Sequence, residues 1–151
     1  MTLAPEDPFS GKAIREGECL IWTGRKTDEG YAVMTHKRRQ TYAHRCAWEL
    51  AHGPVPAGMQ VDHTCHRRDC VFVCHLRLAT PAQNQMNRSG PTRNRKEPLP
   101  RGVWRNYKGF SARVQKDGIN YHLGTFATPE EASAVASAKR KELFGVFAGK
   151  D

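Results

Sequence analysis

The stretch VDHTCHRRDCVFVCHLRLATPAQN, residues 61–84, decides how this chain is interpreted, because it gathers three cysteines and three histidines within 24 residues. Cys65, Cys70 and His75 stand five residues apart in it. Thiolate sulfur and imidazole nitrogen are the usual ligands of zinc. The loop has little apolar content, so bound zinc would supply folding energy that burial cannot. The spacing predicts a structural zinc site, and a set of buried free thiols is the alternative.

A structural zinc ion takes four ligands in a closed tetrahedron, so this loop leaves one ligand to be found. The spacing does not choose among the candidates, which are Cys19, Cys46, Cys74 and His66. The N-terminal segment MTLAPEDPFSGK lacks the basic and apolar regions of a signal peptide. We therefore expect a reducing compartment, where clustered cysteines bind metal more often than they form disulfides.

Asp62, His63 and Asn84 lie in the same stretch but suit a different chemistry. A carboxylate and an amide oxygen are ligands that a hard ion such as Mg²⁺ prefers. Such an ion on a DNA phosphate would stabilise the leaving oxyanion, and a neutral imidazole such as His63 could take a proton from water. The alternative is that Asp62 or His63 serves the zinc site, as a ligand or as a carboxylate behind one.

The charge of the whole chain points to a polyanionic partner. The net charge is +9 and the isoelectric point is about 9.6, which suggests DNA, RNA or an anionic membrane. No apolar run approaches the roughly 18 residues of a membrane span. We therefore expect a nucleic acid as the partner and no membrane.

Composition and punctuation divide the 151 residues into small parts. Hydrophobic residues make up 38%, which favours small domains with thin cores. We predict a loose lead-in at 1–17, a metal-binding domain at 18–89, a basic linker at 90–100 and a second domain at 101–149. The fold class is α+β in both domains.

Apolar periodicity and turn residues predict the elements of both domains. The first should contain strands at 19–22, 31–35, 38–43, 59–63 and 75–79, with helices at 43–53 and from Thr80. The second should contain strands at 102–106, 110–115 and 119–126, then a helix at 129–145. Ala43, Cys46, Ala47 and Leu50 should form the apolar face of the first helix. Thr128 should cap the last helix, and Lys139, Arg140 and Lys141 should be solvated.

The first domain resembles the HNH family of ββα-metal nucleases, especially its phage and homing-endonuclease branch. The resemblance is carried by CLIWTG (19–24), YAHRCAWEL (42–50), GPVPAGMQVDHTC (53–65) and HLRLATPAQN (75–84). The offsets of 2, 7, 12 and 21 from His63 to Cys65, Cys70, His75 and Asn84 are also similar to those of His–Cys box homing endonucleases.

The resemblance implies a role for each of these residues. His63 would be the general base, Asp62 and Asn84 would hold the catalytic divalent ion, and Arg45 would steady the phosphate. The structural zinc would be bound by four residues, with Cys19 ranked ahead of Cys74 and Cys46 as the fourth: Cys19, Cys65, Cys70 and His75. The resemblance also implies double-stranded DNA as the partner, products with a 5′-phosphate and a 3′-hydroxyl, and a cytoplasmic, nucleoid-associated location in a bacterial or phage-infected cell.

One departure from the family pattern lies in the loop. Phe72 and Val73 stand where the family has the Asn and Pro that shape the loop and brace the base. A catalytically inactive, zinc-stabilised DNA-binding or regulatory protein is therefore the second hypothesis, and a dimeric restriction endonuclease is the third. The sequence leaves open whether the protein is a monomer or a homodimer, and whether it nicks or cuts both strands.

The second domain resembles the AP2 DNA-binding domain. The residues that carry this are RGVWRN (101–106), FSARV (110–114), YHLGTF (121–126) and the TPEEASAVASAKRKELFG helix (128–145). The family implies a three-stranded sheet that lies in the DNA major groove and is braced by a helix. The DNA contacts would come from six matching or sheet-borne residues: Arg101, Trp104, Arg105, Arg113, Lys116 and Tyr121.

Overall fold

The computed structural model of this protein describes residues 9–88 and 98–150 and divides the chain into two compact units. The first unit covers residues 1–81 and the second covers residues 82–151. The predicted boundaries at 18–89 and 101–149 differ slightly from this division and stay predictions. Most of the predicted linker at 90–100 lies outside the described residues.

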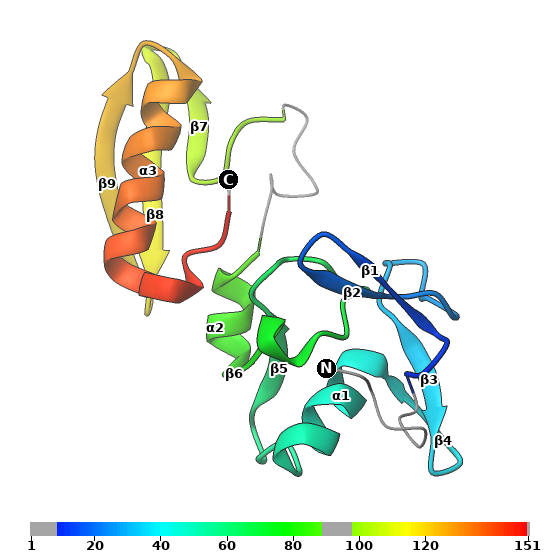
Figure 1. Cartoon of the computed structure of the whole chain (residues 1–151). Coiled ribbons are helices and arrows are strands. Elements are labelled where there is room, and N and C mark those ends of the chain that lie inside the picture. Colours follow the sequence, from blue (N-terminus) through cyan, green and yellow to red (C-terminus); the bar gives the residue numbers. More distant parts are fainter. Residues whose placement is uncertain (1–8, 89–97, 151) are drawn as a thin grey trace. The chain divides into compact units, whose positions relative to one another are not determined.

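Three antiparallel hairpins and one helix make up the first unit (Figure 1). The hairpins are β1 (Ala13–Glu16) with β2 (Cys19–Trp22), β3 (Val33–His36) with β4 (Arg39–Tyr42), and β5 (Gln60–His63) with β6 (Leu76–Ala79). Helix α1 (Ala43–His52) follows β4, and a short 3₁₀ turn η1 (Val73–His75) precedes β6. The predicted strands and helix are confirmed within one or two residues at each end.

The prediction of a loose lead-in is wrong for β1. This strand pairs with β2 in the register Ala13↔Trp22 to Glu16↔Cys19. Gly17 closes the two-residue turn with a φ of +59°, a left-handed conformation that glycine adopts without steric cost. The segment is short and polar, so its sequence alone does not predict a strand. It becomes a strand because it pairs with β2. Residues 1–8 lie outside the described part of the chain.

The core of the first unit forms where α1 meets the hairpins. Trp22, Met34, Val61 and Leu76 are buried in it together with residues of α1. The predicted apolar face of α1 is confirmed for Ala43, Cys46 and Ala47 but wrong for Leu50, which is 53% exposed. The core therefore ends about one turn before the helix does. The helix itself ends at Gly53, which has a φ of +86° and whose N–H bonds to the carbonyl of Glu49.

The second unit is a three-stranded antiparallel sheet covered on one face by a helix (Figure 1). The strands β7 (Val103–Asn106), β8 (Gly109–Lys116) and β9 (Ile119–Phe126) lie in chain order, as predicted. Helix α3 (Pro129–Phe144) ends in a 3₁₀ turn η2 (Gly145–Phe147), and α2 (Pro81–Met86) spans the boundary between the units. The predicted cap is confirmed, since Thr128 and Glu131 form a reciprocal capping box.

Burial in the second unit corrects the expectation that Arg140 is solvated. Ala132 and Ala136 pack against Val103, Ala112 and Val114 of the sheet. Arg140 lies one helical turn beyond Ala136 on the same face and is 3% exposed. Its guanidinium donates a hydrogen bond to the carbonyl of Arg101 at 2.8 Å. Its charge alone suggested that Arg140 is exposed to solvent. Its spacing of four residues from Ala136 instead places it on the face of α3 that packs against the sheet.

Candidate metal centre and catalytic residues

Four side chains of the first unit converge as a metal-binding cluster. The ligand atoms of Cys19, Cys65, Cys70 and His75 all lie within 4.8 Å of one another. His75 Nδ1 lies 3.5 Å from the sulfur of Cys19 and 3.7 Å from that of Cys70. Three thiolates and one imidazole form a complete donor set for a closed structural zinc site. The cluster therefore has the composition and the proximity that zinc requires.

Cys19 is the fourth member of this cluster, as the resemblance ranked it. It lies on β2, and the metal loop docks on that strand through backbone bonds. Val71 N–H donates to the Leu20 carbonyl at 2.8 Å, and Trp22 N–H donates to the Asp69 carbonyl at 2.9 Å. The cluster does not include the other three candidates, His66, Cys46 and Cys74. Cys46 is buried in the core of the first unit, and Cys74 is exposed.

The thiols of the cluster already share hydrogen bonds. The Cys65 thiol bonds to the sulfur of Cys70, which raises the pKa of Cys65 and lowers the pKa of Cys70. Burial raises the pKa of Cys19, with further repulsion from Cys70. Packing several ionisable sulfurs into one buried place favours a cation that neutralises their charge. The charges of the cluster, like the proximity of its ligand atoms, therefore favour a bound metal cation.

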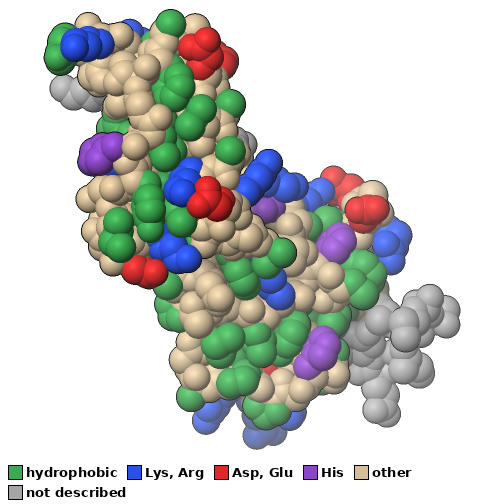
Figure 2. All heavy atoms as spheres, turned by 90° about the vertical axis from the view of Figure 1, so that its left-hand side faces the viewer, with side chains coloured by type: hydrophobic (Ala, Val, Ile, Leu, Met, Phe, Trp, Pro, Cys, Tyr) green, Lys and Arg blue, Asp and Glu red, His purple; other side chains and the backbone are tan. Residues whose placement is uncertain are grey.

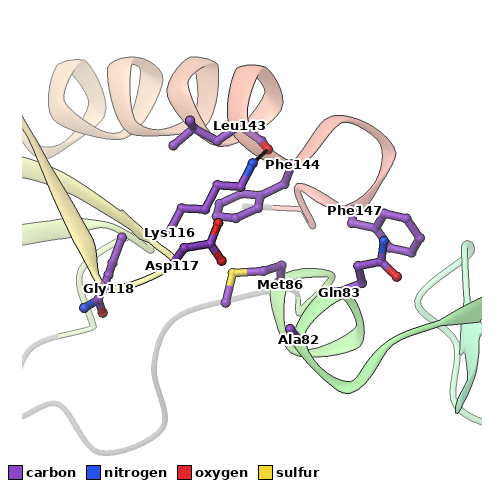
Figure 3. Close-up of a pocket in the computed structure, with 10 residues that line it drawn as sticks. Ala82, Gln83, Met86, Lys116, Asp117, Gly118, Leu143, Phe144 and Phe147 are labelled. Atoms are coloured by element: carbon purple, nitrogen blue, oxygen red, sulfur yellow. Dashed lines mark hydrogen bonds between the residues drawn. The ribbon is translucent and has the colours of Figure 1, made fainter. Parts of the chain in front are cut away.

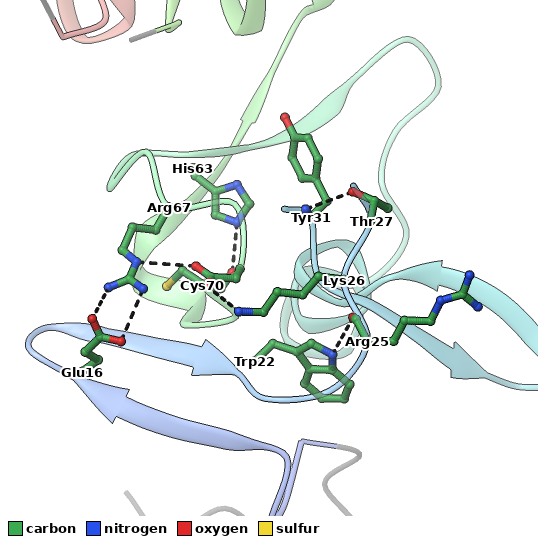
Figure 4. A network of polar contacts seen from close by, with 10 residues as sticks. Glu16, Trp22, Arg25, Lys26, Thr27, Tyr31, His63, Arg67 and Cys70 are labelled. Carbon is green, nitrogen blue, oxygen red and sulfur yellow. Dashed lines mark hydrogen bonds and ion pairs between the residues drawn. The ribbon is translucent and has the colours of Figure 1, made fainter. Parts of the chain in front are cut away.

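Ion pairs hold the metal loop from outside (Figure 4). Arg67 bonds to Glu16 of β1 at 2.7 Å and lies 3.5 Å from Asp69, and Lys26 reaches Asp69 at 2.8 Å. The hydrogen bond and charge of Arg67 lower the pKa of Glu16. Exposed pairs of this kind are each worth little in stability. Together they orient the loop relative to β1 and to the segment after β2.

His63 lies at the end of β5 in a defined orientation. Its Nε2 lies 2.9 Å from the backbone carbonyl of Cys70, and the side chain is 7% exposed (Figure 4). A carbonyl only accepts, so we assign the proton of the neutral ring to Nε2, which leaves the lone pair on Nδ1. Burial lowers the pKa of His63, although the Cys70 carbonyl opposes this. The ring is therefore neutral near pH 7 and can accept a proton at Nδ1.

Asp62 forms a cross-strand ion pair that the sequence reading missed. Its carboxylate accepts a hydrogen bond from Arg77 Nε at 2.8 Å, and the two residues face each other in the β5–β6 register. Asp62 is buried, so this contact is made in a poorly solvated place. Strand pairing of MQVDH with HLRLA would have found Arg77. The role of Asp62 as a metal ligand stays a prediction.

The two remaining catalytic candidates of the first domain are placed as follows. Asn84 lies on α2, within the second unit, so its partnership with Asp62 stays a prediction. Arg45 is an exposed residue of α1 and forms an ion pair with Glu49 one turn later, at 2.9 Å. This i, i+4 pair leaves the guanidinium at the surface, where it could exchange its partner for a phosphate. That role for Arg45 is likewise untested.

His44 is a buried neighbour of His63. It is 7% exposed, and its ring centroid lies 4.6 Å from that of His63. The ring of Tyr42 also stacks on His44, with a centroid distance of 5.6 Å. Burial lowers the pKa of His44 to about 3, with repulsion from His63 as the second cause. A neutral imidazole therefore packs against the candidate base.

In the second unit, cations lie over aromatic rings. Arg113 covers the ring of Trp104 at 4.6 Å, and Arg105 covers Phe110 at 4.7 Å. Trp104 and Arg113 alternate with the buried residues of β7 and β8, which places both on the sheet face opposite α3. Figure 2 shows Lys and Arg side chains interspersed with acidic, histidine and hydrophobic side chains on the face that is drawn.

Three other predicted DNA contacts have partners inside the second unit. Arg101 donates to the carbonyls of Met86 and Arg88 at 2.8 and 2.7 Å. Lys116 donates to the Leu143 carbonyl at 2.8 Å beside a pocket of about 490 Å³ (Figure 3). The ring of Tyr121 lies 5.1 Å from Lys139 of α3, so it is on the helix side of the sheet. Their contacts with DNA stay predictions.

A comparison with known protein families supports the HNH resemblance of the first domain. Residues 41–86 match the family model described as HNH endonuclease, which is similar to this part of the chain. This stretch contains Asp62, His63, Asn84 and three members of the Cys/His cluster. The match ends before residue 101 and says nothing of the AP2 resemblance.

Viral proteins are the relatives that match. The "Uncharacterized HNH endonuclease L560" of Acanthamoeba polyphaga mimivirus is 36% identical over 120 residues, which is 79% of this chain and 61% of that protein. "Protein 7.7" of Escherichia phage T7 is 36% identical over 67 residues, covering 44% of this chain and 52% of that protein. This chain therefore spans about half to three fifths of these relatives. No solved structure gives a significant match.

Within the part of the chain that the structure describes, none of the helices combines the length and the hydropathy that crossing a membrane requires.

Proposed function

We propose that this protein is a sequence-targeted DNA endonuclease of the homing-endonuclease type. His63 is the general base, and Asp62 and Asn84 hold one Mg²⁺-like divalent ion. The Cys/His cluster holds a structural zinc ion. The observation that carries this proposal is the bond from His63 Nε2 to the Cys70 carbonyl, since it fixes the ring and assigns the lone pair of the neutral imidazole to Nδ1. The HNH match over residues 41–86 supports the same reading.

The chemistry follows from the state of His63. Its Nδ1 takes a proton from water, and the resulting hydroxide attacks the phosphorus of a phosphodiester. The bond from phosphorus to the 3′ oxygen breaks, which leaves a 5′-phosphate and a 3′-hydroxyl after that oxygen gains a proton. A divalent ion at Asp62 and Asn84 would stabilise the charge on the leaving oxygen. The buried, neutral state of His63 keeps the base available near pH 7.

The hydrogen bond between His63 and the Cys70 carbonyl forms although the loop lacks the Asn and Pro of the family pattern. Phe72 packs its ring edge-on to His75 at 5.1 Å, and His75 N–H donates to the Phe72 carbonyl at 2.9 Å. The loop thus turns at Phe72 and Val73 and still presents the Cys70 carbonyl to His63. This favours an active centre over the inactive alternative.

The second unit would supply targeting as an AP2-like module. Its sheet leaves Trp104 and Arg113 on the face opposite α3, and a cation stacked on an indole ring suits contact with phosphates and base edges. One catalytic centre in a monomer would nick one strand, whereas a homodimer would cut both. Sizing by light scattering alongside the cleavage assay distinguishes these states.

A plasmid-relaxation assay tests the nuclease. Wild type, His63→Ala and the matched control His52→Ala are compared in Mg²⁺ and in EDTA. We expect relaxed or linear product from wild type and the control in Mg²⁺, and none from His63→Ala or in EDTA. His52 is an exposed histidine of α1 and measures the effect of removing any imidazole. Tight binding of plasmids that carry source DNA, with no cleavage by wild type, would establish the inactive alternative.

A further inference from the structure

The tip of the β3–β4 hairpin is a basic surface that the proposed catalytic site does not use. Lys37 and Arg38 form its two-residue turn and Arg39 begins β4; these three residues are called the basic tip. We propose that the basic tip and the groove beside it form a second DNA-binding surface, on the nuclease unit, that holds the phosphate backbone near His63. This inference rests on the proposed function in that it takes DNA as the substrate.

Turn geometry gives the first argument. Lys37 and Arg38 have φ values of +48° and +63°, and His36 pairs with Arg39 across them, which is the arrangement of a type I′ turn. Both central positions then favour Asn, Asp or Gly, because Cβ crowds the following carbonyl in the left-handed conformation. Gly has no Cβ, and the short side chains of Asn and Asp can form local hydrogen bonds there. The bulky cations at both positions are therefore not there to make the turn.

A second hairpin of the same chain shows the usual solution. The β8–β9 turn has Asp117 and Gly118 at the corresponding positions, with φ values of +51° and +80°. The chain thus uses the favourable residues where only a turn is needed. Strain accepted in the β3–β4 turn points to a role for the two cationic side chains themselves.

Charge and exposure give the second argument. All three residues of the basic tip are exposed. Within residues 9–88 and 98–150, none of the three side chains has an ion-pair or hydrogen-bond partner. Three adjacent cations repel one another, and a bound polyanion would relieve this repulsion. Binding would also release counterions from the polyanion, which favours the complex.

A groove continues from the basic tip toward α1. It has a volume of about 450 Å³ and is lined by residues of the β2–β3 segment, β3, β4 and α1: Thr27, Val33, Gln40, Thr41, Tyr42 and Arg45. Gln40 directly follows the basic tip in the chain, and Arg45 lies in the first turn of α1. Amide, hydroxyl and guanidinium groups of this kind bind phosphate and sugar oxygens.

The groove also approaches the candidate base. Tyr42 lines it, the Tyr42 ring stacks on His44 at 5.6 Å, and His44 lies 4.6 Å from His63. A single buried ring thus separates the groove wall from His63. A strand held by the basic tip and the groove would pass close to the nitrogen that activates water, so this surface would position the scissile phosphate.

The decisive variant is the full-length double substitution Lys37→Asn with Arg38→Gly. It gives the turn the residues that a type I′ conformation favours and removes two positive charges. We expect the melting temperature to stay equal or rise by a few degrees. The Kd for a random-sequence duplex should rise by about tenfold or more, and the slope of log K against log salt should become shallower by roughly two units.

Controls keep the two proposals separate. Lys12→Asn with Arg15→Gln removes two exposed cations of the β1 hairpin, and Arg39→Gln removes the third tip charge from a strand position without altering the turn. A duplex affinity and salt slope of the tip variants equal to those of the β1 control would overturn the DNA-binding surface, even if wild type cleaves DNA. Selective loss of affinity at the tip in a protein that does not cleave would keep this surface and reject the nuclease. A melting temperature that falls in the double variant would refute the argument from strain.

Discussion

The pH dependence of stability in the first unit follows from the burial of His44. The side chain is 7% exposed and its pKa is lowered from 6.5 to about 3, chiefly by burial. The unfolded chain therefore binds a proton at higher pH than the folded chain does. The contribution of His44 to stability is complete above its unfolded pKa of 6.5 and is lost as the pH falls through the window from 6.5 to about 3.

The size of this effect can be worked from the two pKa values. Each unit between the unfolded pKa and the pH corresponds to about 1.4 kcal/mol, so moving from pH 7 to pH 5 removes about 2 kcal/mol from the free energy of unfolding. Neutral His44 also contacts the rings of Tyr42 and His63, and repulsion from His63 and Arg45 adds to burial in disfavouring a charged ring there. Acid should therefore loosen the wall behind the candidate base.

Urea denaturation at pH 7, 6 and 5 measures this loss, with tryptophan fluorescence as the probe because Trp22 is buried in the same unit. Loss of metal at low pH also destabilises a Cys/His site, so the comparison must include His44→Phe, which keeps a ring but cannot titrate. We expect the pH slope of the variant to be flatter than that of wild type by about 2 kcal/mol over this range. Parallel slopes in the two proteins would refute the reasoning.

Three further predictions concern the zinc cluster, the cross-strand pair and the second unit. Cys19→Ser should remove zinc, measured by metal analysis after dialysis, and lower the melting temperature of the first unit, whereas Cys74→Ser should keep its zinc; equal zinc content in both would reject Cys19 as the fourth ligand. Asp62→Ala should destabilise the first unit by about 3 kcal/mol or more, because it takes the carboxylate from a buried pair with Arg77, and a loss below about 1 kcal/mol in urea denaturation would show that the pair is unimportant. Thr128→Ala should cost the second unit about 1 kcal/mol by breaking the capping box, and an unchanged denaturation midpoint would contradict the cap.

Much of the secondary structure was open to prediction because its signals are local. The apolar spacing of Ala43, Cys46 and Ala47 specifies the buried face of α1, and Thr128 with Glu131 specifies the start of α3. The signals failed where an element depends on a partner. β1 exists because β2 pairs with it, and Leu50 keeps the helical spacing although the core has already ended beneath it.

The candidate site was predictable to a similar extent. Spacing alone gave Cys65, Cys70 and His75, since ligands close in sequence share one loop. The HNH resemblance supplied the ranking of Cys19, and the fold placed it in the cluster through backbone bonds between β2 and the loop. Arg77 went unnoticed because its partner Asp62 lies across a hairpin, where only strand register brings the two together.

By itself, the sequence determined the ligand chemistry, the basic charge and the order of strands, loop and helix, because these depend on residue type and local periodicity. The tertiary structure alone decided which backbone carbonyl orients His63, which ring packs behind it, and which arginines face solvent or the interior. Such contacts join residues that are distant in the chain, and their geometry is fixed only when the hairpins and helices pack. The strained basic tip is the same case, since its residues read as an ordinary polar run until their φ values are known.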